Sequence, residues 1–452
     1  MQATSTIRLS ELLGALSTAL DMTEGQPAGH SMRTCWIGTN IGMKLGLEGQ
    51  RLHDLYYTLM LKDLGCTSDA ARICQLFLTD DIQLKRNMLS TDFTRTPQAV
   101  RFLLSHTAVG EDLPRRLKTL FHIAANTQTI NREVIETRCT RGADIARQMR
   151  FGDDVADGIR DLDDHWAGSA QSRGLRGNDI AFNARIALLA QVIDVFAMAQ
   201  GPDAALAEVE LRSGRWFNPE LVKVFRDVSR QPNLWEVWGS KTLEDDLFQL
   251  EPALVSAEVD DDYLDDITLA FAQVIDAKSP YTIGHSERVT DFTDLIADEL
   301  GTSEPRRRWL RRGALLHDVG KLGVRARTLK PGKLDDEEWS EMRMHSVYTE
   351  QVLSRIPAFA ELTPIATAHH ERLDGAGYPY GLSGAQIAME TRILTTADIF
   401  DALTADRPYR AAMPLEKALD LMAGMRGTAI DPDCFTALRA VVEAQVEQKA
   451  VA

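Results

Sequence analysis

Apolar residues recur at every third or fourth position along most of this chain. The spacing is clearest in three stretches, 7–20, 55–64 and 184–198. Strict alternation of apolar and polar residues is scarce, and glycine and proline separate the periodic blocks. Because a helix returns to the same face about every 3.6 residues and a strand every two, the pattern predicts an almost all-α protein.

The helical pattern occurs twice, with recognisable stretches in the same order. The matching pairs are 29–33 with 284–288, 61–65 with 316–320, and 174–180 with 381–387. The first two pairs are separated by 255 positions and the third by 207. The first copy therefore carries about 48 additional residues between Gly65 and Arg138, and we expect a helical insertion that includes residues 117–125. Ordered repetition of this kind indicates two copies of one helical unit.

The two copies predict two domains, at residues 1–230 and 262–447. The residues between them, 231–261, contain Pro232, Pro252 and an aspartate run that begins at Asp260. Because proline interrupts helices and like charges repel one another, we expect this segment to be a linker or a connecting helix.

The second copy concentrates side chains that bind metals. Five histidines and two aspartates there are candidate ligands, in a chain with 10 histidines. They are His285, His317, Asp318, His345, His369, His370 and Asp398. Imidazole mixed with carboxylate suits divalent transition metals, and a carboxylate such as Asp318 can bridge two ions that activate water and hold a phosphoryl group.

Each of these residues also has a simpler explanation when it is taken alone. A single histidine can be a surface or capping residue, and His370 can orient His369 without binding metal. The adjacent pair His317-Asp318 is followed by Gly320, which lets the backbone turn so that Lys321 reaches the same cavity. The whole set, rather than any one member, indicates a metal centre.

The first copy differs at the equivalent positions. Those positions hold His30, Lys62, Asp63, Arg138, Leu162, Asp163 and Gln191. Lys62 and Arg138 place positive charge where the second copy has imidazole, and Leu162 has no ligand atom. We therefore predict that the first copy binds no di-metal centre and that its role is structural, sensory or dimer-forming.

With these motifs in place, the second copy resembles the HD-GYP family, a branch of the HD-domain metal phosphohydrolases. The resemblance rests on residues 285–289, 315–323, 369–379, 392–393, 397–404 and 406–410, which include the triplet Gly377-Tyr378-Pro379. It implies tandem all-α HD-domain bundles, the second of them catalytic. The first copy resembles the same family in degenerate form, with Ala170-Gln171-Ser172 in place of the triplet.

The resemblance also implies an activity and residue roles. It implies hydrolysis of cyclic di-GMP to pGpG or GMP at a bi- or trinuclear centre of iron or manganese that is held by the seven residues above. Asp318 and Lys321 would be catalytic. Residues of the substrate pocket would be Asp401, Arg407, Arg410, Tyr378 and Gly377. Because Tyr281 stands where members with a third metal have glutamate, we expect two ions.

Two other functions stay open. One is a phosphodiesterase that prefers cyclic GMP-AMP, since nothing in the motifs separates guanine from adenine. The other, of a different class, is a catalytically silent nucleotide-binding or scaffold protein, because degenerate HD domains often serve in that way.

Composition and net charge limit the partners and the cellular location that we expect for this protein. The net charge of −16 argues against bulk binding to nucleic acid or anionic membranes. The five cysteines show no CxxC spacing, which is typical of reduced cytosolic thiols. We see no signal peptide, and the most apolar stretch, 187–199, is interrupted by Gln191 and Asp194. We therefore predict a cytoplasmic protein without a membrane span, and a possible homodimer through the N-terminal copy.

Overall fold

The computed structural model describes residues 7–168, 173–252, 259–330, 332–406 and 411–451. Its regular elements across these ranges are helices, joined by loops with three isolated β-bridges. This confirms the predicted all-α class. The chain divides into two compact units, Met1–Asp260 with Arg325–Arg327, and Asp261–Val324 with Thr328–Ala452.

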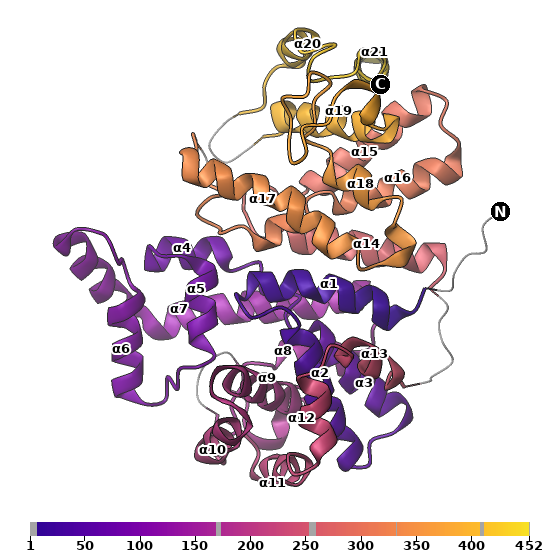
Figure 1. The fold of residues 1–452 in the computed structure, drawn as a ribbon. Helices are drawn as coiled ribbons and strands as arrows, with labels where there is room; N and C mark the ends of the chain where they lie inside the picture. The colour runs from indigo at the N-terminus through magenta and orange to yellow at the C-terminus, as the bar shows by residue number, and fades with distance from the viewer. Residues whose placement is uncertain (1–6, 169–172, 253–258, 331, 407–410, 452) are drawn as a thin grey trace. The chain divides into compact units, whose positions relative to one another are not determined.

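The first unit, drawn from indigo to dark red in Figure 1, is a bundle of helices. Its helices are α1 (Leu9–Thr23), α2 (His30–Lys44), α3 (Gly49–Leu61), α4 (Ala70–Phe77), α5 (Asp81–Met88), α6 (Thr96–His106), α7 (Leu113–Gln148), α8 (Asp153–Arg160), η1 (Gly177–Asp179), α9 (Phe182–Gln200), α10 (Pro202–Arg212), α11 (Pro219–Val228), α12 (Pro232–Trp238) and α13 (Leu243–Gln249).

The centre of this unit is the contact of α2 with α3 and α9. Helix α9 is apolar over most of its surface, and Leu189, Val192 and Ile193 are fully buried. A helix that is apolar all round belongs in a core or in a membrane. By length and composition α9 could cross a membrane, but 67% of its most apolar window is buried inside the unit. The packing thus accounts for its apolar composition.

Residues 231–252, expected to belong to a linker, instead form part of the first unit. Helices α12 and α13 pack against α2, and the Trp36 indole nitrogen donates to the Leu234 carbonyl at 2.9 Å. Leu234 and Leu247 are buried. Pro232 begins α12 rather than interrupting a helix, because the first helical position needs no backbone N–H.

The additional residues between Gly65 and Arg138 are helical, as predicted. They form α4, α5, α6 and the first part of α7. Buried Ile73, Leu84 and Phe102 make a separate apolar cluster among these helices. The insertion therefore has a small core of its own.

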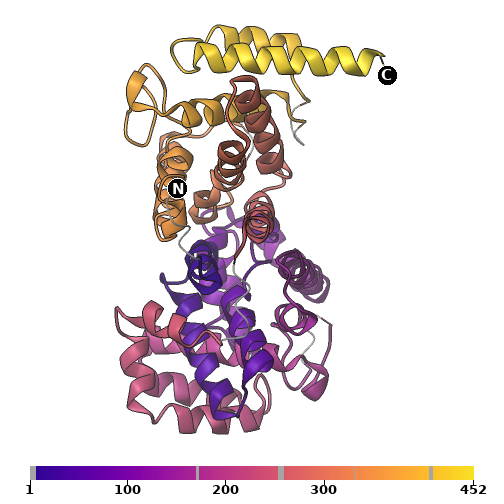
Figure 2. The ribbon, with the colours of Figure 1, turned by 90° about the vertical axis from the view of Figure 1, so that its right-hand side faces the viewer.

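The second unit, drawn from dark red to yellow in Figure 1, also consists of helices. They are α14 (Asp261–Asp276), α15 (His285–Glu299), α16 (Glu304–Leu316), η2 (Val319–Gly323), α17 (Asp336–Leu353), η3 (Pro357–Phe359), α18 (Thr363–Thr367), η4 (Gly384–Gln386), α19 (Met389–Thr404), α20 (Leu415–Ala423) and α21 (Pro432–Val451). Helix α15 packs against α16, α19 and α21, and one apolar cluster joins residues of these helices. Figure 2 shows α21 as a continuous yellow helix at the end of this unit.

One local arrangement occurs in both units. In the first unit, the Asp21 carboxylate accepts from the Ser31 backbone N at 2.9 Å and from its hydroxyl at 2.6 Å. In the second unit, Asp276 accepts from the same two groups of Ser286, at 3.1 and 2.7 Å. Asp276 and Ser286 follow Asp21 and Ser31 by 255 positions each, which is the spacing of the sequence repeat. The shared arrangement supports the prediction of two related copies.

Candidate metal centre

The pair His317-Asp318 lies where α16 ends and the short η2 turn begins. Gly320 of that turn packs directly on α17. A Cβ there would lie 1.9 Å from the His345 carbonyl oxygen, so no larger residue fits without moving the backbone. The Thr349 hydroxyl strengthens the contact by donating to the His317 carbonyl at 3.0 Å and accepting from the Gly320 N–H at 3.0 Å. The turn therefore brings His317 and Asp318 against His345.

Three histidines of the cluster are oriented in the same way. The Nδ1 atoms of His317, His345 and His369 lie 2.6, 2.5 and 2.6 Å from the backbone carbonyl three residues earlier in each case. A carbonyl oxygen can only accept, so each Nδ1 must donate. In the neutral ring the Nε2 atom then carries a lone pair, which is the state that a metal ligand needs.

Asp318 lies at the centre of the cluster and is 1% exposed. Its Oδ2 atom lies 3.3 Å from His317 Nε2 and 3.5 Å from His285 Nε2. Its Oδ1 atom lies 3.6 Å from His345 Nε2 and 3.8 Å from His369 Nε2. The two oxygens thus face different pairs of imidazoles, as a carboxylate that bridges two ions would.

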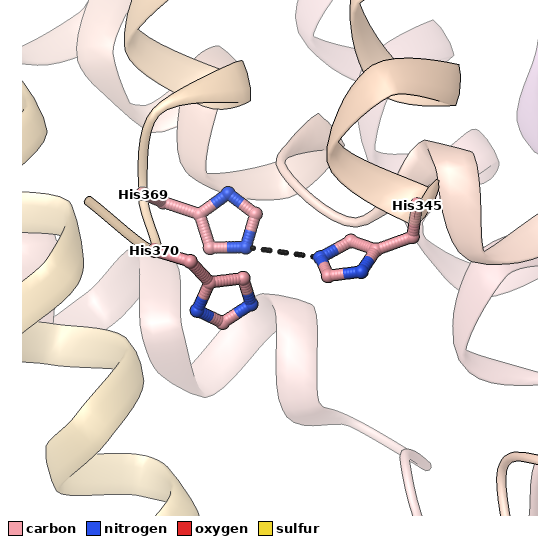
Figure 3. A group of neighbouring side chains, drawn as sticks. All are labelled: His345, His369 and His370. Carbon is pink, nitrogen blue, oxygen red and sulfur yellow. Dashed lines mark hydrogen bonds between the residues drawn. The ribbon is translucent and has the colours of Figure 1, made fainter. Parts of the chain in front are cut away.

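All the predicted ligands come together in overlapping groups, within each of which one ligand atom per residue lies within 4.8 Å of the others. The groups are His345 with His369 and His370, His285 with His317 and Asp318, and His317 with His369 and Asp398. Figure 3 shows the first group, with His369 and His370 on one segment facing His345 of α17. Asp398 completes the set, with Oδ1 3.4 Å from His285 Nε2.

The electrostatics of the cluster favour a cation. Burial lowers the pKa of His345 to about 4 and that of His370 to about 3, so both rings are neutral at pH 7. Although burial disfavours a charged His285, hydrogen bonds to surrounding carboxylates raise its pKa well above the usual value. His317 Nε2 and Asp318 Oδ1 are buried without a hydrogen-bond partner. Buried lone pairs that face one another need a cation between them, so these residues fit divalent metals.

Asp401 has a different position from the one expected. It is 1% exposed, and within the described ranges it lines neither hollow beside the cluster. Its Oδ2 atom accepts from His285 Nδ1 at 2.7 Å, and its Oδ1 atom accepts from Arg288 Nε at 2.6 Å. Asp398 and Asp401 are one helical turn apart on α19, and only Asp398 reaches the cluster. Asp401 instead orients His285, as carboxylates behind metal-binding histidines commonly do.

Lys321 extends from the η2 turn back to the cluster. Its ammonium donates to Asp318 Oδ2, and its side chain is 19% exposed. It lines a hollow of about 460 Å³ together with Ser279, Tyr281 and Lys330. Lys321 therefore connects the central carboxylate with a space that is open to solvent.

A second hollow, of about 370 Å³, lies on the other side of His370. Tyr378 and Gly377 line it with Arg343 and Trp339, and Trp339 also lines the first hollow. The Tyr378 ring lies 4.8 Å from the His370 ring, and the Arg343 guanidinium carbon lies 5.5 Å from the Tyr378 ring centroid. This grouping suits a planar base beside a phosphate.

Gly377 lines this hollow because its backbone is packed against the preceding segment. A Cβ there would lie 2.5 Å from the Arg372 nitrogen and from the Glu371 Cα. Its role is therefore to allow close approach of the loop that carries Tyr378. Arg407 and Arg410 lie outside the residues that the structure describes.

Sequence reasoning missed Trp339, Arg343 and Lys330 as pocket residues. None lies in a recognisable motif. Trp339 and Arg343 are four residues apart on α17, a spacing that places them on one helix face. The four-residue spacing was the available signal in the sequence. It identifies pocket residues only once the rotation of α17 against its neighbours is known.

The equivalent positions of the first unit are arranged differently. Lys62 Nζ lies 3.2 Å from His30 Nε2 and also donates to Asp63. Arg138 donates to Asp163. An ammonium and a guanidinium thus stand where the second unit has imidazoles, which supports the proposal that this copy holds no di-metal centre.

Glu24, Asp63 and Cys66 do form a compact group of potential ligand atoms in the first unit. Lys85 Nζ lies 3.2 Å from Glu24 Oε1, and Lys62 donates to Asp63. Burial raises the pKa of the Cys66 thiol well above its usual value, so it is protonated and a poor ligand. Lysine charges already balance these carboxylates.

Comparison with known proteins places the chain in a family. Residues 270–434 match the model of the HD domain family. A 3′3′-cGAMP-specific phosphodiesterase of Vibrio cholerae is 50% identical over 97% of this chain and 95% of its own length. A crystal structure of a cyclic GMP-AMP specific phosphodiesterase from V. cholerae matches 97% of this chain and 98% of that chain, with 45% identity and a TM-score of 0.66. The cyclic di-GMP phosphodiesterase response regulator RpfG of Xanthomonas campestris is 40% identical over 37% of this chain and 45% of its own length. The chain therefore belongs to the HD-GYP family of HD-domain phosphodiesterases.

Proposed function

We propose that this protein is a metal-dependent phosphodiesterase that hydrolyses 3′3′-cyclic GMP-AMP. The observation that carries the chemistry is the position of Asp318, whose two oxygens each lie 3.3–3.8 Å from the Nε2 atoms of two histidines. The relative that covers nearly the whole chain acts, by its name, on 3′3′-cGAMP, whereas RpfG matches a much shorter part. This reverses the order expected from the motifs, in which cyclic di-GMP came first.

The seven predicted ligands would hold two divalent ions, of iron or manganese. Such a pair lowers the pKa of a shared water and stabilises charge on the phosphoryl group during in-line attack. Asp318 would keep the two ligand groups together, and Asp401 would hold His285 in the ligating tautomer. In this proposal Asp318 is a metal ligand, and Asp401 is a positioning residue that would contact no metal itself.

The substrate would lie over the two hollows beside the cluster. Its two bases would stack on Trp339 and Tyr378, since aromatic faces accept any base. Lys321 and Arg343 would contact the phosphates. Hydrolysis breaks one P–O3′ bond, and the leaving oxygen would receive a hydrogen bond from the Lys321 ammonium.

The test is turnover by the purified full-length chain with manganese or ferrous iron. We expect 3′3′-cyclic GMP-AMP to be opened to a linear dinucleotide with kcat/KM at least tenfold above that for cyclic di-GMP. A reversed ratio would restore cyclic di-GMP as the substrate. If neither is hydrolysed while metal is bound, the enzyme proposal fails and the silent binding or scaffold function remains.

The remaining expectations stay predictions. They are a cytoplasmic location, no binding to nucleic acid or membranes, and homodimerisation through the N-terminal unit. Sedimentation of the full chain and of residues 261–452 would test the last of these. An unchanged dimer in the shorter chain would exclude the N-terminal unit as its basis.

A further inference from the structure

The first unit contains a cavity of about 240 Å³. Engineered apolar cavities of about 150 Å³ already accept a benzene molecule, so this one is large enough for a small organic ligand. Helices α4 to α7, which carry the insertion (Figure 1), supply most of the residues that line it. The second copy lacks the corresponding segment, so the cavity is specific to the first.

The wall formed by the insertion is apolar. Ile73, Leu84 and Phe102 belong both to the separate apolar cluster and to the cavity lining. Ile123 and Ile130 of α7 complete this side and are buried. A surface of this kind favours an apolar ligand body.

The opposite end of the cavity is polar, and it includes two positions that correspond to predicted metal ligands of the second unit. Arg138 and Asp163, which occupy the positions of His345 and His370, line it and pair with each other. Lys85, also in the lining, lies 2.7 Å from Asp69 and 3.2 Å from Glu24. Burial raises the pKa of Glu24 and so favours its neutral form, which leaves Lys85 paired with Asp69 and Arg138 paired with Asp163.

A neutral polar group lies beside these ion pairs. The His165 ring stacks on Trp216 with centroids 3.9 Å apart, and both line the cavity. Burial lowers the pKa of His165 to about 4, so the ring is uncharged at pH 7. A ligand head would therefore meet an imidazole and compensated ion pairs rather than a free charge.

We propose that this cavity is a binding site for an uncharged, mainly apolar small molecule with one hydrogen-bonding head, such as a hydroxyl or a carbonyl. The apolar wall formed by the insertion receives the body, and the balanced polar end receives the head. A charged head would be buried there without a counter-charge, which is unfavourable.

The test is calorimetric titration of the full-length protein with 1-decanol, decanoate and decylamine. We expect saturable binding of decanol, at least tenfold tighter than that of either charged analogue. Binding should also change the fluorescence of Trp216, and the change should disappear in Trp216→Phe. Absence of saturable decanol binding overturns the site, and tighter binding of a charged analogue overturns the neutral-head inference.

Two variants locate the site. Ile130→Phe narrows the interior, and Thr127→Trp narrows the cavity at an exposed lining position; each should weaken decanol binding at least tenfold. Leu117→Trp is the matched control, because Leu117 lies on the same helix, is 56% exposed and does not line the cavity. Circular dichroism checks that each variant is folded. Unchanged affinity in a folded Thr127→Trp or Ile130→Phe variant would contradict the proposal.

Discussion

Gly320 and the His345 carbonyl oxygen are so close that a Cβ on the glycine would lie 1.9 Å from that oxygen. Gly65 and Arg138 of the first unit have the same relationship, also at 1.9 Å. The contact between the turn and the long helix thus occurs in both units, although the side chains around it differ. The contact positions His317 and Asp318 in the second unit and Lys62 in the first.

This contact predicts the effect of Gly320→Ala. The added methyl must push η2 away from α17, at a cost of about 1–3 kcal/mol or more, and His317 and Asp318 would move with it. We expect a loss of at least half of the bound metal and at least a tenfold fall in turnover. Metal analysis and steady-state kinetics measure these.

Two glycines provide controls for that variant. Gly65→Ala should lower the free energy of unfolding in a similar way but leave the metal content unchanged. Gly152→Ala, where a Cβ would meet nothing within 4 Å, should alter neither quantity by much. Full metal content and activity in Gly320→Ala would show that the contact does not position the ligands.

Asp318→Asn should abolish activity by removing the central charge at nearly constant volume. We expect turnover to fall at least a hundredfold and bound metal to fall below one ion per chain. The matched variant in the first unit, Asp63→Asn, leaves Lys62 buried without its partner and should destabilise the fold by about 3–5 kcal/mol. Its metal content should not change. A fall in metal content in Asp63→Asn would place metal in the first unit.

Asp401→Asn separates a positioning role from a pocket role. If Asp401 orients His285, metal affinity should fall about 10–100-fold, and excess metal should restore part of kcat while KM for the dinucleotide changes little. A rise in KM with unchanged metal affinity would instead support the pocket role that the family motif suggested.

The buried His165 predicts a pH dependence of stability. Its pKa is about 4 in the folded chain and about 6.5 when unfolded, so the unfolded state binds a proton first as the pH falls. This residue therefore lowers the free energy of unfolding between pH 6.5 and 4, by about 2 kcal/mol at pH 5. Urea unfolding of wild type and His165→Phe at pH 7 and 5 measures it, and an equal decrease in both proteins would refute the assignment.

The clustering of the seven predicted ligands followed from the sequence, because they lie in short motifs whose residue types have few other uses. The helical class followed from periodicity, and the insertion followed from the change in spacing between the copies. The contact of Asp401 with His285 was not predicted, because the motif around Asp398 does not say which face of α19 reaches the histidine cluster. The packing of α12 against α2 was not predicted, because a proline at the first helical position looks, in sequence, like a proline that ends a helix.

Pocket residues such as Trp339 and Arg343 depend on how α17 is rotated against its neighbours. That rotation is set by the packing of Gly320 against His345, which sequence spacing alone does not reveal. The cavity of the first unit depends in the same way on packing among the inserted helices, so periodicity predicted the helices without predicting the space between them.

The central claim is that the second unit holds two metal ions around Asp318 and the first unit holds none. Metal analysis of anaerobically purified full-length protein, with Asp318→Asn and Asp63→Asn measured beside it, tests this most directly. We expect about two ions of iron or manganese per chain in the wild type and in Asp63→Asn, and fewer than one in Asp318→Asn. A wild-type chain without metal, or two ions retained in Asp318→Asn, would contradict it.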